Sequence, residues 1–153
     1  MSEISLIYDG IYSRLATLLS GHQKLPNPYN LAMNSEQFLD RGYGVTIGPM
    51  VNQRLFQSCK TAIQRQFGVV VTRSFIKRDF DTGPRETREK ELLEDLALLY
   101  PDFYNANQLT ATGASIKDFD SDNGVEFVFP DRENFIFINC TILINYFENF
   151  TPP

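Results

Sequence analysis

Apolar and polar residues alternate along the segment 135–147, FIFINCTILINYF. Successive side chains of a β-strand point to opposite faces, so this alternation predicts one long strand. Its even-numbered face is apolar and should be core; it comprises Ile136, Ile138, Cys140, Ile142, Ile144 and Tyr146. Its odd-numbered face is mixed; it comprises Phe135, Phe137, Asn139, Thr141, Leu143, Asn145 and Phe147.

The odd-numbered face is too apolar for open water and too polar for the interior of a small monomer, so something should cover part of it. Two interpretations stay open. Either a neighbouring subunit covers this face, which is typical of an assembly protein, or the chain's own helix or loop does. We expect a subunit or partner contact at Phe135, Phe137, Leu143 and Phe147.

Two segments repeat their apolar residues at helical spacing. The first runs over 4–19 and is followed by Gly21, which can end a helix in the left-handed conformation. Residues 81–84 start the second, because proline suits the first position of a helix. Its apolar stripe covers 92–100, and Pro101 should stop it.

Alternation and flanking glycines or prolines predict further strands at 43–49, 61–77, 114–119 and 125–129. Gly68 should mark a bulge or bend within the second of these strands. The dipeptide Asn123-Gly124 is typical of a tight turn, so the last two strands are expected to form a hairpin.

Residues 22–42 connect the first helix to the first strand without a clear period. Connections of ~20 residues are uncommon unless they have a function, so we expect an extended arm that becomes ordered in an assembly. A partner could bury its apolar anchors Leu25, Tyr29, Leu31 and Phe38. The alternative is a surface loop that Leu31, Phe38 and Leu39 pack against the chain's own fold.

The order of elements is therefore helix, arm, two strands, helix and three strands. This order predicts an α+β fold, with a mainly antiparallel sheet and both helices on one face. A chain of 153 residues fits a single domain, 1–153, with the arm at 22–42 and a short tail at 150–153. No apolar run is long enough to span a membrane and the start does not read as a leader, so we expect a cytoplasmic location.

The net charge of -5 argues against a general nucleic-acid-binding protein. A local basic cluster comprises Arg73, Lys77, Arg78, Arg85 and Arg88. Glutamates are interleaved with part of it, which predicts a solvated surface whose charges pair with one another. Cys59 and Cys140 lie in or beside predicted strands without CxxC spacing, so we expect buried, reduced thiols.

The most site-like motif is the acidic segment 118–124, where Asp118, Asp120 and Asp122 alternate as calcium ligands do. Its sixth and twelfth positions are Asn123 and Phe129 instead of the required glycine and glutamate, so a polar turn is the better interpretation. The only histidine, His22, follows a helix end and should pack there. These residues predict no catalytic site, no metal site and no cofactor.

Three runs carry a resemblance: RGYGVTIGPMVNQRL at 41–55, RQFGVVVTRSFIKRD at 65–79 and TREKELLEDLALL at 87–99. Together with the first helix and the closing strands, they resemble the tail terminator (tail completion) proteins of tailed bacteriophages. The resemblance covers the order of elements over nearly the whole chain. It implies a structural virion protein without catalytic residues, which forms a homo-oligomeric, usually hexameric, ring that ends the tail tube and joins it to the head connector.

The partners that this resemblance implies are further copies of the chain, the tail tube protein, and the head connector or head-closure protein. DNA would only pass through the channel, which suits a negative net charge. No membrane is involved, and the location is the virion neck after assembly in the host cytoplasm. The length of the arm leaves open another neck role, in head closure or as an adaptor.

Two other classes also stay open. A ligand-binding domain or enzyme of this architecture would show a deep pocket with converging polar groups. A monomeric regulator would show its apolar face covered internally.

Overall fold

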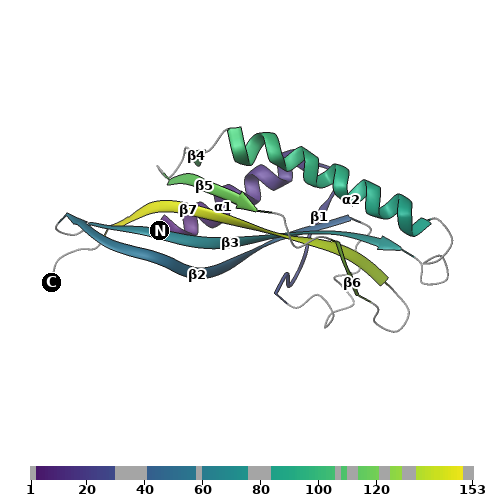
Figure 1. The fold of residues 1–153 in the computed structure, drawn as a ribbon, viewed down its shortest axis with the longest axis horizontal. Helices are drawn as coiled ribbons and strands as arrows, with labels where there is room; N and C mark the ends of the chain where they lie inside the picture. The colour runs from purple at the N-terminus through teal and green to yellow at the C-terminus, as the bar shows by residue number, and fades with distance from the viewer. Residues whose placement is uncertain are drawn as a thin grey trace.

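The computed structural model describes residues 3–29, 41–57, 60–75, 84–105, 108–109, 114–120, 125–128 and 134–149. The described elements are α1 (Glu3–Leu18), β1 (Gln23–Lys24), β2 (Arg41–Gln57), β3 (Lys60–Phe75), α2 (Pro84–Tyr100), the π-helical η3 (Pro101–Asn105), β4 (Gln108–Leu109), β5 (Ala114–Asp120), β6 (Val125–Val128) and β7 (Asn134–Asn149). They form an α+β fold, as predicted (Figure 1). No helix within the described ranges has the length and hydropathy needed to cross a membrane.

The strands form one sheet in the order β1-β2-β3-β7-β5-β4, and β6 also pairs with β7. Only β1 and β2 run parallel among these pairs. The predicted long final strand is confirmed as β7, which pairs with β3 from Asn134 to Asn149. β5 and β6 share the other edge of β7.

The hairpin predicted at Asn123-Gly124 is wrong. Asp120 pairs with Thr141 and Val125 pairs with Ile138, so β5 and β6 run in the same direction along one edge of β7. The chain therefore does not reverse direction between them. The long β7 offers backbone partners to both segments, and this pairing replaces the one that a local hairpin would provide.

Both helices pack on the even-numbered face of β7 (Figure 1). The buried apolar residues of α1 and α2 recur three or four positions apart, which places them on one side of each helix. A single core cluster joins them to the sheet: Ile7, Ile11, Leu15, Leu92, Leu96, Leu99, Ile136, Ile138, Cys140, Ile142, Ile144 and Tyr146. Cys140 is a buried free thiol as predicted, and burial, with a smaller effect of Asp120, raises its pKa to about 12.

The chain does not stop its helical course at Pro101. It continues as η3, whose Phe103 is buried and stacks on Phe119 of β5 at 5.2 Å between ring centroids. Proline removes one N–H from the α-helical ladder, and the wider π-helical turn begins at that point. The ring of Tyr100 meets Phe119 edge-on, so the end of α2 is held against β5.

The bulges lie elsewhere than predicted. Gly68 pairs regularly with Thr46, whose side chain fills the space that a Cβ on Gly68 would need. In β5, the register shifts at Lys117, and this extra residue turns Phe119 towards the core, opposite Ile142. Glycine therefore serves close packing here, while the bulge restores the inward position of an aromatic side chain.

β2 extends well beyond the predicted range 43–49, because the strand tolerates Pro49. This proline lies within a register shift between Ile47 and Met50, where no regular ladder bond is needed. On the outer edge of β2, beyond the two residues that pair with β1, hydroxyl groups take the place of a partner strand. The N–H of Val45 donates to Tyr12 Oη at 3.0 Å, and the N–H of Ile47 donates to Tyr29 Oη at 2.7 Å.

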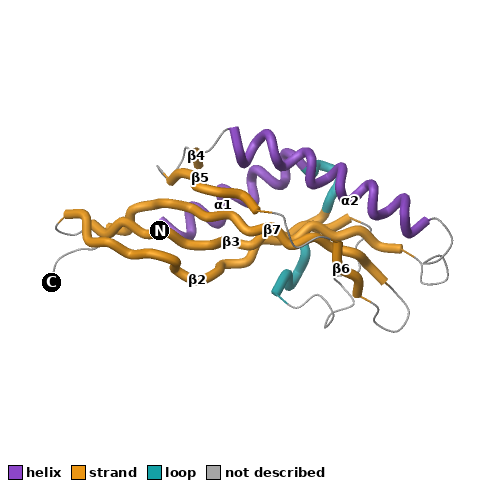
Figure 2. Tube along the Cα trace, in the orientation of Figure 1, coloured by secondary structure: helices purple, strands orange, loops and turns teal. Residues whose placement is uncertain are grey.

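The start of the predicted arm, residues 25–29, packs on the chain's own sheet; we call it the arm base. After β1 the loop passes to the side of the sheet opposite the helices (Figure 2). Leu25 is buried, and a Cβ added to Gly42 would lie 2.7 Å from its Cδ2 atom. A Cβ added to Gly44 would lie 2.5 Å from Pro28 Cβ. Glycines of β2 thus allow the arm base to lie directly against the strand.

Substituting Gly44→Ala should lift the arm base from the sheet. The new Cβ would overlap the rigid ring of Pro28, and overpacking of this kind costs about 1–3 kcal/mol. We expect a lower melting temperature and faster tryptic cleavage after Lys24. Gly21→Ala is the control, since its Cβ would meet only the mobile guanidinium end of Arg41, at 3.2 Å. Equal melting of both variants would contradict tight packing of the arm base.

Candidate functional site

The candidate site is the side of the sheet opposite the helices, which we call the helix-free face. Residues that pair directly across neighbouring strands share a face, so the odd-numbered residues of β7 identify the others. This face has two halves along β7. The half near Phe137 is covered, and the half near Phe147 is open.

The chain itself covers the first half. Thr72, Val70 and Phe137 are at most 8% exposed there, and Leu25 of the arm base is 2% exposed. The prediction of partner contacts at Leu25 and Phe137 is therefore corrected: both are packed inside the monomer. For Leu25 the physical reason is that Gly42 and Gly44 of β2 leave room for the arm base.

The second half is open. Leu143 is partly buried and Phe147 is 39% exposed. We call this part of the helix-free face the open end; it comprises Arg54, Ala62, Gln64, Leu143, Asn145 and Phe147. It combines apolar surface with polar groups, as the cores and rims of protein interfaces do.

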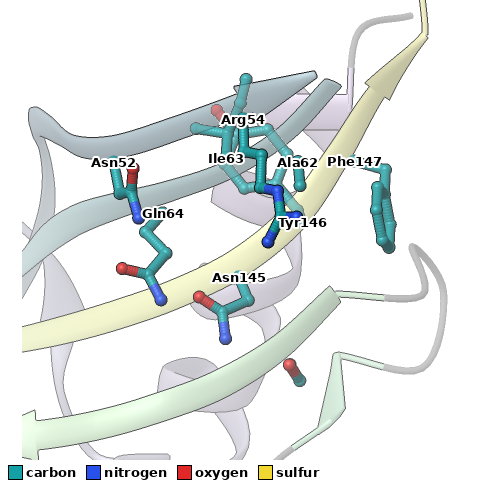
Figure 3. Close-up of a pocket in the computed structure, with 9 residues that line it drawn as sticks. Asn52, Arg54, Ala62, Ile63, Gln64, Asn145, Tyr146 and Phe147 are labelled. Atoms are coloured by element: carbon teal, nitrogen blue, oxygen red, sulfur yellow. The ribbon is translucent and has the colours of Figure 1, made fainter. Parts of the chain in front are cut away.

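A row of polar side chains crosses the open end. Asn52, Gln64, Asn145 and Ser115 pair in register across β2, β3, β7 and β5 (Figure 3). They line a hollow of about 310 Å³, together with Arg54 and Phe147. The Oδ1 atom of Asn145 is buried and has no hydrogen-bond partner among the residues that the structure describes. Buried acceptors are normally paired, so this atom favours a donor supplied from outside the chain.

The groups of the hollow suit binding. Amides both donate and accept hydrogen bonds, a guanidinium donates, and an aromatic ring offers apolar area. Two lining residues, Ser115 and Tyr146, carry hydroxyl groups, and Tyr146 Oη accepts a hydrogen bond from Arg65 Nε at 3.2 Å. Among the described residues, no histidine or carboxylate lines the hollow to act as a base. Arg54 is exposed and makes no ion pair within the described residues.

The other predicted contact residues have different positions. Tyr29 is 63% exposed, and its hydroxyl accepts a hydrogen bond from the N–H of Ile47, so Tyr29 lies on the surface at the β2 edge. Leu31 and Phe38 lie outside the described residues, as does the side chain of Phe135.

The acidic segment is only partly described. Asp118 and Asp120 are exposed on β5, and Asp118 Oδ1 accepts the neighbouring N–H of Phe119 at 2.9 Å. Asp122 lies outside the described residues. Within the described ranges, no three metal-ligating side chains of His, Cys, Asp or Glu come together.

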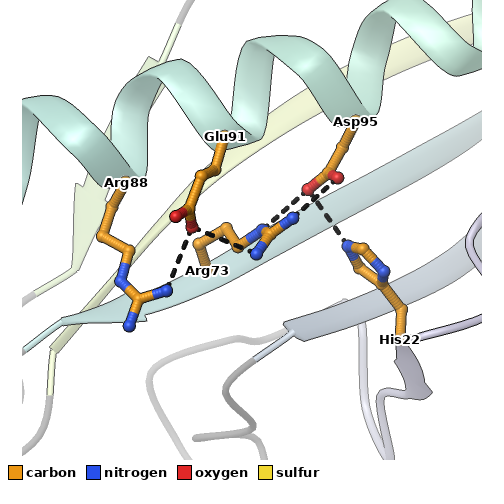
Figure 4. A network of polar contacts seen from close by, with 5 residues as sticks. All are labelled: His22, Arg73, Arg88, Glu91 and Asp95. Atoms are coloured by element: carbon orange, nitrogen blue, oxygen red, sulfur yellow. Dashed lines mark hydrogen bonds and ion pairs between the residues drawn. The ribbon is translucent and has the colours of Figure 1, made fainter.

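A buried charge network lies on the helix side of the sheet (Figure 4). Arg73 of β3 binds Asp95 of α2 through two hydrogen bonds of 2.8 Å. His22 Nε2 lies 3.0 Å from Asp95 Oδ2. Arg73 and Arg88 both donate to Glu91 Oε2, at 3.1 and 3.0 Å. The network joins α2 to β3 and to the residue that precedes β1.

Asp95 is held in its charged form. Burial alone would raise its pKa, but hydrogen bonds from His22 and Arg73 outweigh burial and keep the pKa below the ordinary value of 3.8. The paired carboxylate in turn compensates Arg73, which is only 5% exposed. Such a bidentate pair fixes both position and orientation.

The network corrects two predictions. Arg73 is buried instead of solvated, although Arg88 pairs with Glu91 as the predicted surface pairing requires. The imidazole of His22 reaches across to Asp95, while its backbone N–H answers the carbonyl of Leu19. The predicted left-handed conformation of Gly21 is also absent.

Sequence reasoning did not find Asp95. Two signals pointed to it. Arg73 follows Val69 and Val71 on the core face of its strand, where a charge requires a buried partner. Asp95 lies between Leu92 and Leu99 on the apolar side of its helix.

No protein-family model matches this chain, and no curated protein matches it.

Asp95→Asn should destabilise the protein and reduce its sensitivity to acid. Removing one partner leaves the Arg73 charge buried, at a cost of about 3–5 kcal/mol. The folded-state pKa of Asp95 is depressed, so its contribution is present above 3.8 and is lost as pH falls below that value. Urea denaturation at neutral and acidic pH measures both effects.

The wild type should therefore lose more stability between neutral and acidic pH than the variant. Asp9→Asn, at an exposed position of α1, should follow the wild type at every pH. Parallel pH profiles for Asp95→Asn and the wild type would contradict the assigned role of Asp95.

Proposed function

We propose that this chain is a structural virion protein that forms a homo-oligomeric, hexameric ring at the head-proximal end of a phage tail. The ring ends the tail tube and joins it to the head connector. The role is architectural, without catalysis or a cofactor. The observation that carries the proposal is the open end, where Leu143 and Phe147 remain accessible although the half of the helix-free face near Phe137 is covered.

Only one half of the helix-free face is covered by the chain, and this supports association through the open end. The half near Phe137 is buried within the chain, and the arm base packs on Gly42 and Gly44 of β2 in that half. The chain therefore covers one half of the face and leaves the other accessible. Apolar side chains that remain on a sheet face beside a polar hollow are typical of a protein contact. The orphan acceptor on Asn145 adds a hydrogen bond that a partner can complete.

The protected edge of β2 supports contact through faces. Exposed strand edges recruit further strands and lead to open-ended aggregation. Along β2, β1 pairs at Gly42 and Tyr43, and the hydroxyls of Tyr12 and Tyr29 bind the N–H groups further along. This part of the edge is therefore closed to another strand, which suits a ring of limited copy number.

The expected order of elements agrees with the resemblance to tail terminators, and so does the charge. A net charge of -5 suits a channel through which DNA passes without being held. The partners in this proposal are further copies of the chain, the tail tube protein and the head connector or head-closure protein, in the virion neck. Another neck role, in head closure or as an adaptor, fits the same surfaces.

A second candidate function rests on the hollow. Its volume of about 310 Å³ and its amide row would also suit a small neutral polar ligand stacked on Phe147. In that case the isolated protein stays monomeric and gains melting temperature on binding.

Leu143→Asp should block self-association and leave the monomer folded. A charge on a contact surface opposes association more than folding, because the side chain can stay hydrated in the free monomer. Light scattering on a sizing column and electron microscopy of the wild type should show rings. The variant should elute as a monomer with a cooperative melt.

Ala16→Asp, which places the same charge on an exposed position of α1, is the matched control and should form rings. A Leu143→Asp chain that cannot fold would show that the position is internal core. Rings formed equally by all three proteins would exclude the open end as the contact. Added to the polymerising tail tube protein of the same virus, wild-type rings should cap the tubes and fix their length.

A further inference from the structure

A second exposed patch lies on α2, on the side of the helix facing away from the core. Leu93 and Leu98 are each 52% exposed there, and Glu94 and Ala97 are exposed between them. These positions are spaced i, i+1, i+4 and i+5, so they form one compact surface on two helical turns. We call Leu93, Glu94, Ala97 and Leu98 the α2 patch. Its leucines are not needed for the core, which uses Leu92, Leu96 and Leu99.

The α2 patch and the open end lie on opposite sides of the molecule. α2 covers one face of the sheet, and the open end belongs to the other face (Figure 1). One copy cannot bring the two patches together. A contact between unlike patches of two copies is head-to-tail, and repeated head-to-tail contacts close into a ring where the rotation allows it.

The two patches complement each other in charge. The open end carries Arg54, and the α2 patch carries Glu94. Neither side chain makes an ion pair within the described residues. A single guanidinium on one patch and a single carboxylate on the other can fix the register of a contact.

The patches also complement each other in shape and polarity. A hollow of about 310 Å³ has room for a leucine side chain, and Phe147 and Leu143 provide apolar surface beside it. Ala97, between the two leucines of the α2 patch, lets the helix backbone approach the sheet closely. Helices pack on sheets in this way inside single domains.

We propose that the α2 patch of one copy seats in the open end of the next copy, with Glu94 against Arg54. This inference rests on the proposed function, since it names the surface that completes the subunit contact. The helix of one subunit would then give the open end a helical cover like the one that α1 and α2 give the opposite face.

A charge exchange tests the contact. Arg54→Glu and Glu94→Arg should each weaken self-association at least about tenfold, because like charges then face each other. The double variant should recover to within a few-fold of the wild type. Sedimentation over a concentration series at 0.15 M salt measures this, and the losses should shrink in high salt.

A mixture sharpens the test. In an equimolar mixture of the two single variants, every junction of an alternating ring pairs opposite charges. The mixture should therefore form rings although each variant alone does not. Gln53→Glu on the other side of β2 and Asp9→Arg on α1 are the controls, and both should associate as the wild type does.

The outcomes separate this inference from the proposed function. If Glu94→Arg and Leu93→Asp form normal rings while Leu143→Asp stays monomeric, the ring stands and the α2 patch is not the partner surface. If the double variant and the mixture both fail to recover, the pairing of Arg54 with Glu94 is overturned. A wild type that is monomeric at every concentration contradicts both proposals.

Discussion

The placement of every other element depends on how β7 is paired. β3 follows it along its whole length, and this register decides which residues point to the helices. A slip by one residue would bring Phe137, Asn139 and Thr141 into the core and expel the apolar even-numbered set. β5 and β6 then take the remaining edge, so β7 has partners on both sides. The sheet thereby acquires one largely apolar face, which two amphipathic helices cover.

The opposite face of the sheet is neither uniformly apolar nor completely covered. Its β7 residues are a mixture of apolar, amide and hydroxyl side chains, and the chain covers only the half on which the arm base also packs. Leu25 and Pro28 lie where β2 carries glycines, so close approach is possible there. Beyond that point β2 carries larger side chains, among them Asn52 and Arg54, and the face stays open. The position of glycines along one strand thus separates internal packing from surface that is accessible to a partner.

The sequence predicted what depends on local periodicity. The strand 135–147 and the apolar stripe of the second helix follow from spacing, because burial of one face leaves a regular pattern, and proline gave the start of that helix at Pro84. The wrong or missing predictions concern contacts between segments that are distant in the sequence. Asn123-Gly124 favours a turn, yet the chain continues along β7 on both sides of it. The pairing of His22 with Asp95 joins residues 73 positions apart, so the sequence around either residue does not predict it. The position of Arg73 on a core face did indicate that a buried carboxylate must lie nearby. Leu143 and Phe147 of the open end were named from the sequence as contact residues, and their role in contact stays a prediction. Arg54 and Glu94 were not named, because their relation depends on which face of the fold each occupies.

The buried charge network connects these levels. Asp95 lies on the inner side of α2, one residue from Glu94 of the α2 patch, and its pairing with Arg73 fixes the helix over β3. His22 joins the same carboxylate and lies three residues before Leu25 of the arm base. One carboxylate therefore orients both the helix that carries the α2 patch and the segment that leads into the arm base on the opposite face. A closed ring needs a constant angle between its two contact surfaces, because an error in that angle accumulates around the ring. Apolar packing alone tolerates small rotations of a helix on a sheet, whereas a bidentate ion pair has one good geometry. In a ring-forming protein, this buried pair would serve geometric precision more than stability.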